Sequence, residues 1–131
     1  MKKKPKSLRQ LKEICWKLFS EYIRRSHADE WGTVECITCG KLMFWKESQC
    51  GHFVGGRTAS VLFVEDICYP QCPQCNVFFR GSYASYTLKM LDLHGREWVE
   101  DKLTLKSQTV KFTRTDLLEK IEHYKQKLEA L

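Results

Sequence analysis

Two Cys-x-x-Cys pairs constrain this 131-residue chain more than any other feature. The first pair is Cys36 and Cys39, and the second is Cys72 and Cys75, with 32 residues between the pairs. Each pair turns tightly and directs two sulfur atoms towards one point, so two pairs supply the four thiolates that a structural Zn²⁺ prefers. We therefore predict that these cysteines bind one zinc ion; two unrelated turns or a redox pair are the alternative. Because sulfur fills every coordination position, such a zinc stabilises the fold and leaves no position for water.

The other three cysteines are expected to be buried small apolar residues. Seven cysteines is a high and odd number in a chain without a recognisable signal peptide, which favours metal binding over a disulfide framework. Cys15 lies on an apolar helical stripe and is assigned to the core. Cys50 and Cys68 lie near the two pairs, so a role as alternate zinc ligands stays open for them.

Charge is unevenly distributed along the chain. The net charge is +6 overall, whereas residues 1–25 alone carry +7. A basic segment attached to a near-neutral domain suits a polyanion such as nucleic acid, although a solvated terminus that only aids solubility is an alternative. We expect residues 1–6 to form a flexible basic arm with four DNA-binding lysines: Lys2, Lys3, Lys4 and Lys6.

Length and hydropathy indicate a single cytoplasmic domain, placed at residues 7–131. No stretch of about 18 apolar residues is present, so we expect no membrane span. The basic start is not followed by the apolar segment of a signal peptide.

Periodicity predicts helices towards both ends and short strands between them, which is an α+β fold. Apolar residues recur at three- and four-residue steps in the first segment, and Thr113 with Asp116 resembles a capping box at the start of the last. The helices are expected at residues 7–27, 83–94 and 97–105 and from Thr113 onwards. The strands are expected at residues 43–45, 51–54 and 61–64.

The last helix carries a four-three apolar pattern close to a coiled-coil seam. The residues of this seam are Leu117, Ile121, Tyr124, Leu128 and Leu131. The seam could pair two chains into a homodimer, or it could pack on the core of its own chain.

The segment QCGHFVGGR, residues 49–57, places His52 between the cysteine pairs at the end of a predicted strand. If sulfur satisfies the zinc, His52 is free for other chemistry. The order strand, loop, strand, cysteine pair and helix puts His52 and Asn76 on opposing elements, where they can face one cleft. The alternatives for His52 are a further metal ligand or a structural histidine.

The segments CITCGK, QCGHF and QCPQCNVFFRGSYASY resemble the NinG, or Rap, family of phage recombination proteins, over about residues 8–131. They are similar, more distantly, to phage endonuclease VII and other His-Me finger (HNH) nucleases. The resemblance implies a ββα-metal (His-Me finger) core, braced by the four-cysteine zinc site and flanked by N- and C-terminal helices. It also implies that His52 is a general base and that Asn76 binds a catalytic Mg²⁺ or Mn²⁺.

The implied activity is an endonuclease that acts on branched DNA, such as Holliday junctions, in the cytoplasm of a bacterial host. Imidazole is a suitable base near pH 7, and a hard cation stabilises the charge that grows on the phosphate and leaving oxygens. The expected products carry a 5′-phosphate and a 3′-hydroxyl. A junction has two-fold symmetry, so matched cuts need two active sites and hence two chains.

Three positions depart from the family pattern. Many HNH enzymes have an aspartate before the histidine, where this chain has Gly51. Family members often carry asparagine and histidine where Ile67 and Tyr69 stand. The neighbouring carboxylates, Glu65 and Asp66, are candidates to complete the catalytic metal site, Asp66 first, unless both are exposed strand-end charges.

Two alternatives to the junction nuclease therefore remain open. One is a non-catalytic zinc module that binds DNA or a recombination partner, and the other is an HNH nicking nuclease that acts on linear duplex. Arg57 and Arg80 are candidate phosphate contacts in each case, or else solvated loop residues. The aromatic residues of the central segment are expected in the core rather than stacked on bases: Trp45, Phe53, Phe63, Phe78 and Phe79.

Overall fold

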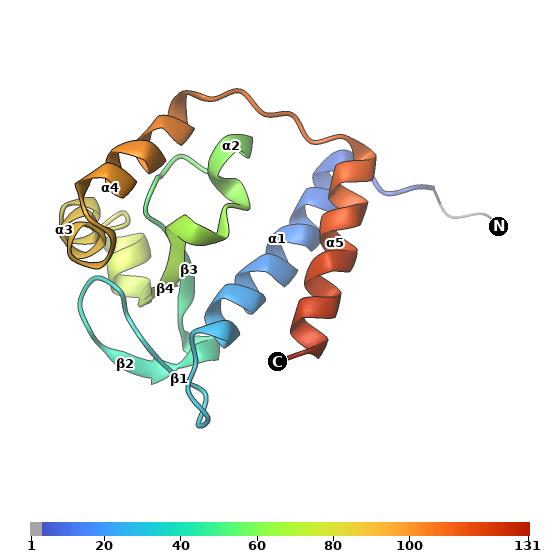
Figure 1. Cartoon of the computed structure of the whole chain (residues 1–131). Helices are drawn as coiled ribbons and strands as arrows, with labels where there is room; N and C mark the ends of the chain where they lie inside the picture. The colour runs from blue at the N-terminus through green and yellow to red at the C-terminus, as the bar shows by residue number, and fades with distance from the viewer. Residues whose placement is uncertain (1–3) are drawn as a thin grey trace.

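The computed structural model describes residues 4–131 and confirms the α+β fold class, with five helices and two small antiparallel sheets in that range (Figure 1). The helices are α1 (Leu8–Ser26), α2 (Ala59–Leu62), α3 (Tyr83–His94), α4 (Arg96–Leu103) and α5 (Arg114–Glu129). The strands are β1 (Thr33–Glu35), β2 (Leu42–Phe44), β3 (Gln49–His52) and β4 (Cys68–Gln71). Short helical turns are η1 (Trp45–Glu47), η2 (Glu65–Ile67), η3 (Gln74–Phe78) and η4 (Thr104–Ser107).

Side-chain caps set where the first and last helices begin. Ser7 and Gln10 form a capping box before α1, in which each side chain accepts a hydrogen bond from the backbone N–H of the other. Thr113 and Asp116 form the same arrangement before α5. The predicted starts of both helices are confirmed, because these local signals need no tertiary context.

Helices α1 and α5 lie side by side and pack through their apolar faces (Figure 1). The rings of Phe19 and Tyr124 meet edge to face at 5.3 Å. Three seam residues of α5 are buried in the shared core, Leu117, Ile121 and Tyr124. The seam is thus used within one chain, so it is not free to form the predicted homodimer contact, and dimerisation stays a prediction.

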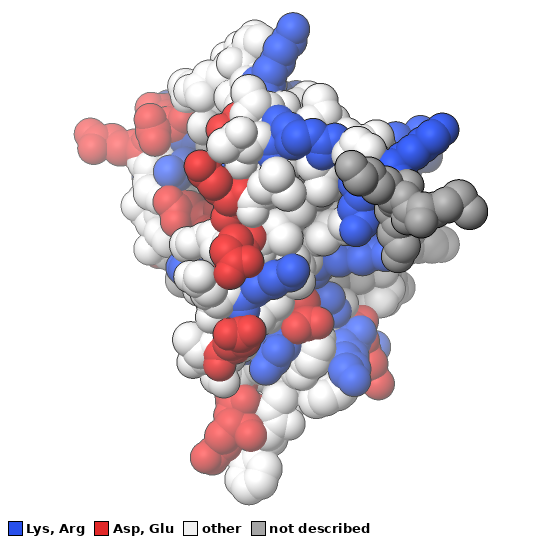
Figure 2. All heavy atoms as spheres, turned by 90° about the vertical axis from the view of Figure 1, so that its right-hand side faces the viewer, with Lys and Arg blue, Asp and Glu red and all other residues white. Residues whose placement is uncertain are grey.

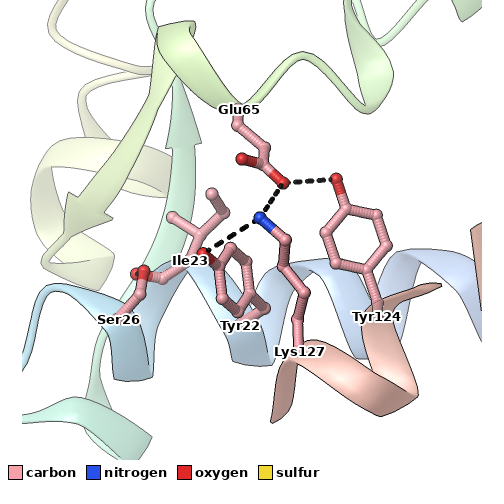
Figure 3. A network of polar contacts seen from close by, with 6 residues as sticks. All are labelled: Tyr22, Ile23, Ser26, Glu65, Tyr124 and Lys127. Atoms are coloured by element: carbon pink, nitrogen blue, oxygen red, sulfur yellow. Dashed lines mark hydrogen bonds and ion pairs between the residues drawn. The ribbon is translucent and has the colours of Figure 1, made fainter. Parts of the chain in front are cut away.

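A polar network joins α5 to η2 and α1 next to this seam (Figure 3). Glu65 accepts a hydrogen bond from the Tyr124 hydroxyl at 2.8 Å and lies 3.8 Å from Lys127 Nζ. Lys127 also reaches the Tyr22 hydroxyl at 3.5 Å. Glu65 therefore has a structural role, as the partner of two α5 side chains.

The structure of the central segment differs from the sequence prediction in one strand and in two aromatic residues. Residues 61–64 were predicted as a strand, but Val61 and Leu62 belong to α2, and the strand that pairs with β3 is β4. Both residues are fully or nearly buried. A short buried apolar run has no periodicity that separates a strand from a helical turn, which explains the error.

Two of the aromatic residues assigned to the core are also wrongly predicted. Phe53 and Phe63 are buried as expected and Trp45 is half-buried, but Phe78 is 76% exposed and Phe79 is 53% exposed. Both lie at the end of η3, beyond Cys75, where the chain turns away from the core. An apolar side chain favours burial but does not enforce it.

The packing around Gly51 leaves no space for a side chain at this position. The Gln71 side chain is fully buried and donates hydrogen bonds from Nε2 to Thr38 Oγ1 at 3.1 Å and to the Gly81 carbonyl at 2.9 Å. These bonds direct Gln71 Oε1 towards Gly51, where a β-carbon would lie only 2.0 Å from it. The space of a side chain at residue 51 is occupied by Gln71.

We predict that Gly51→Ala destabilises the folded protein by about 1–3 kcal/mol, the usual cost of overpacking a core. Urea unfolding of the zinc-loaded protein measures this cost. In a Gln71→Ala background the same substitution should cost much less, because the clashing amide is absent. Equal costs in the two backgrounds would show that Gln71 is not the obstacle.

Candidate functional site

The four predicted zinc ligands come together from both sheets. Cys36 follows β1, Cys39 is three residues further along, Cys72 follows β4 and Cys75 lies in η3. Their sulfur atoms all lie within 4.8 Å of one another, and Cys39 Sγ and Cys72 Sγ are 3.7 Å apart. A tetrahedral zinc with Zn–S bonds of about 2.3 Å separates its sulfurs by about 3.8 Å. The donor set and its spacing therefore fit a structural zinc.

Hydrogen bonding favours the thiolate form of Cys36, which is the form that binds a metal cation. Burial opposes ionisation of Cys36, but hydrogen bonds from the Thr38 hydroxyl and from backbone N–H groups outweigh it and lower the pKa of the Cys36 thiol. The Lys41 backbone favours the thiolate of Cys39, but burial and the neighbouring thiols outweigh that contact and raise the pKa of Cys39. Four thiolates cannot coexist at this distance without a metal, and zinc binds the thiolate form.

The remaining cysteines are core residues. Cys15, Cys50 and Cys68 are buried and lie outside the cluster. Burial raises the pKa of Cys15 to about 11, as expected for an inert thiol. Within residues 4–131, the four zinc-type cysteines are the single group of three or more Cys, His, Asp or Glu side chains close enough to bind one ion.

His52 lies at the end of β3 and is only 8% exposed. Its Nε2 is 3.0 Å from the carbonyl oxygen of Leu62. A carbonyl can only accept, so Nε2 carries the hydrogen and Nδ1 holds the lone pair of the neutral ring. Nδ1 has no hydrogen-bond partner among residues 4–131. The arrangement is that of a fixed, neutral imidazole with one nitrogen able to accept a proton.

Electrostatics keep this imidazole neutral. Burial lowers the pKa of His52; the Leu62 carbonyl opposes that effect, and the charge of Arg57 adds to it. The ring also stacks on Trp16 of α1, with centroids 5.4 Å apart and planes at 18°. Trp16 was not identified from the sequence. It lies 36 positions before His52, and no local pattern reports a contact over that separation.

The predicted ligands of a catalytic metal make separate contacts. Asn76 donates from Nδ2 to Gln49 Oε1 at 2.7 Å, at the opposite end of β3 from His52. Asp66 lies 3.5 Å from Lys102 Nζ. No hydrogen bond or ion pair among the described residues joins His52, Asn76 and Asp66. Three strand residues span about 10 Å, so Asn76 and His52 make their contacts at well-separated places along β3.

The positions that depart from the family pattern also have structural roles. Ile67 is fully buried in the main core. The Tyr69 hydroxyl is 3.0 Å from His94 Nε2, and the His94 ring stacks on Trp98 at 3.9 Å. Neither Ile67 nor Tyr69 is arranged as a metal ligand.

The predicted DNA-binding residues are spread over the surface. Arg57 and Arg80 are exposed, and both adopt positive φ angles, 49° and 51°. Lys4 and Lys6 are exposed near the start of α1, and the Lys6 carbonyl accepts a hydrogen bond from Arg114. Lys2 and Lys3 lie outside the described residues. Figure 2 shows the face that carries α5, with acidic side chains concentrated along one side and basic side chains mostly along the other.

The fold defines an α+β protein, in which a four-cysteine cluster that could hold a metal ion lies beside an antiparallel strand pair that carries His52. The family model described as Bacteriophage Lambda NinG protein matches residues 1–131, so the chain belongs to the NinG family. Neither the curated proteins nor the solved structures contain a match to it. No helix within residues 4–131 is long and apolar enough to cross a membrane.

We predict one tightly bound zinc per chain in protein purified without added metal, as measured by elemental analysis. Cys72→Ser should abolish stoichiometric zinc and lower the melting temperature sharply, because metal-binding energy contributes to folding. Cys50→Ala is the matched control, since it removes a buried cysteine outside the cluster and should retain the zinc. Folded wild-type protein without zinc would contradict the assignment.

Proposed function

We propose that this NinG-family chain is a metal-dependent DNA endonuclease that cuts branched recombination intermediates of the Holliday-junction type. In this proposal β3, β4 and η3 form a ββα-metal (His-Me finger) core that the zinc site braces. The observation that carries the proposal is the geometry of His52, with Nε2 held by a carbonyl and Nδ1 unpaired. Membership of the NinG family supports it.

His52 would act as the general base. Its burial and the nearby arginine favour the neutral ring, so Nδ1 can take a proton from water at neutral pH. The hydrogen bond from Nε2 to Leu62 keeps the ring in one tautomer while it does so. Hydrolysis by that water would leave a 5′-phosphate and a 3′-hydroxyl.

A catalytic Mg²⁺ or Mn²⁺ fits the described residues only in part. Asn76 would be its protein ligand through Oδ1, since Nδ2 is committed to Gln49. Such ions often retain waters and bind substrate phosphates, and the ion would neutralise charge on the reacting phosphate. Asp66 pairs with Lys102 through Oδ2, which leaves Oδ1 as its oxygen for a metal ion, and Gly51 offers no side chain.

A junction substrate also has consequences for the oligomeric state of the protein and for the cellular compartment in which it acts. Paired cuts across a two-fold symmetric junction require two active sites, which favours a homodimer. Because the α5 seam packs on α1, the two chains would meet through another surface. DNA of a phage is processed in the cytoplasm of its bacterial host, where we place the activity.

A non-catalytic zinc module that binds DNA or a recombination partner is the second candidate. The absence of contacts between His52, Asn76 and Asp66 in the described part of the chain favours it. The buried position of Ile67 and the engagement of Tyr69 with His94 favour it too. An HNH nuclease that nicks linear duplex is the third candidate and would use the same histidine.

We predict that His52→Ala lowers junction cleavage by about 10²–10⁴-fold, the usual contribution of a general base, while zinc content and junction affinity stay nearly unchanged. Single-turnover cleavage of a labelled four-way junction measures the rate. His123→Ala, on the exposed side of α5, is the control and should cut normally. Asn76→Ala should differ from His52→Ala, because extra Mn²⁺ should partly restore its cleavage. Wild-type cleavage by His52→Ala would assign the histidine a purely structural role.

We predict that removing residues 2–6, which include four lysines, weakens binding to every form of DNA. Each lost phosphate contact should flatten the slope of log affinity against log salt by about 0.9. Titrations of junction and duplex at several salt concentrations measure this slope, and the ratio of the two affinities should change little. An unchanged slope would mean that these lysines contact no phosphate.

A further inference from the structure

Trp16 contacts two of the residues assigned to the candidate site. The His52 ring stacks on it, and the guanidinium carbon of Arg57 lies 4.4 Å from the centre of the indole ring. Trp16 belongs to α1 but is only half-buried, outside the fully buried stripe of that helix. One side chain of α1 thus joins a histidine of β3 to an arginine of the loop that follows.

The backbone of this loop places Arg57 in an unusual conformation. Arg57 follows Gly55 and Gly56, and its φ of 49° lies in the left-handed region, which non-glycine residues seldom adopt. Within residues 4–131 it makes no ion pair and no hydrogen bond, so its charge is not neutralised by the protein. Stacking on indole orients a guanidinium and leaves its N–H edges free for planar acceptors such as phosphate.

We propose that Trp16 is a positioning residue that holds Arg57 beside His52, so that Arg57 binds one phosphate group of a nucleic-acid backbone next to the lone pair of His52 Nδ1. The inference rests on the proposed nuclease function, because it names the groups that would engage the reacting phosphate. The charge of Arg57 is close enough to act on the imidazole, and burial already disfavours the protonated ring. A phosphate at this place would accept hydrogen bonds from the oriented guanidinium of Arg57, while Nδ1 of His52 would accept one from a water molecule beside the phosphate.

A binding measurement with inorganic phosphate tests the inference without requiring cleavage. The zinc-loaded, full-length protein is titrated with phosphate at constant ionic strength, and the imidazole nitrogen signals of His52 are followed by NMR. The wild type should give a saturable shift at His52. Arg57→Gln and Trp16→Leu should each raise the dissociation constant by about tenfold, the effect of losing a hydrogen bond to a charged group. Trp16→Phe should retain most of the affinity, because phenylalanine keeps an aromatic face.

Arg96→Gln is the control for Arg57→Gln. Arg96 is also exposed, but it lies at the start of α4 in an ion pair with Glu100. The Arg96→Gln protein should bind phosphate beside His52 as the wild type does. Zinc content and amide spectra report whether each variant is folded, and Arg57→Gln still decides the question if Trp16→Leu does not fold.

Phosphate binding and DNA cleavage are separate measurements, so the phosphate site and the nuclease activity can be tested independently. If the wild type shows no saturable shift at His52, or if Arg57→Gln binds phosphate as the wild type does, the inference is wrong even when DNA is cut. If phosphate binding depends on Arg57 and Trp16 but no DNA substrate is cut, the phosphate site stands and the nuclease proposal fails.

Discussion

The four-cysteine cluster is the contact on which the arrangement of the two small sheets depends. Strands β1 and β2 have three residues each, and an isolated two-stranded sheet is at best marginally stable in water. The core around them is small: among residues 4–131 its buried members are Val34, Met43 and three of the cysteines. A zinc ion joined to both sheets would supply the missing stability, because metal-binding energy becomes folding energy.

The same cluster fixes the hairpin that carries His52. Cys72 follows β4 directly, and the register of β4 against β3 sets Cys68 opposite His52. Tyr86 of α3 donates a hydrogen bond to the Gly51 carbonyl at 2.8 Å, and Trp16 of α1 covers the imidazole ring. The histidine is thus held by elements from the start, middle and later part of the chain. A side chain held in this way loses little conformational entropy when it binds another group.

Local patterns predicted the parts of this protein whose causes are local. The spacing of Cys36, Cys39, Cys72 and Cys75 predicted their convergence, and the predicted capping box of Thr113 and Asp116 is present at the start of α5. The surroundings of His52 depend instead on contacts between distant segments, with Trp16 and with the Leu62 carbonyl. The same holds for Gly51, whose packing against Gln71 depends on hydrogen bonds with Thr38 and Gly81. No periodicity or motif encodes such contacts.

If a zinc-braced pair of strands presents His52 to the phosphodiester backbone of branched DNA, the protein must cut such DNA. The most direct test incubates the purified wild type with labelled four-way junction, linear duplex and single strand, with Mg²⁺ or Mn²⁺ and with EDTA. We expect paired cuts in the junction that require the divalent ion, with 5′-phosphate and 3′-hydroxyl ends. Tight junction binding without cleavage, by zinc-loaded protein in either metal, would contradict this role of His52 and favour the non-catalytic zinc module.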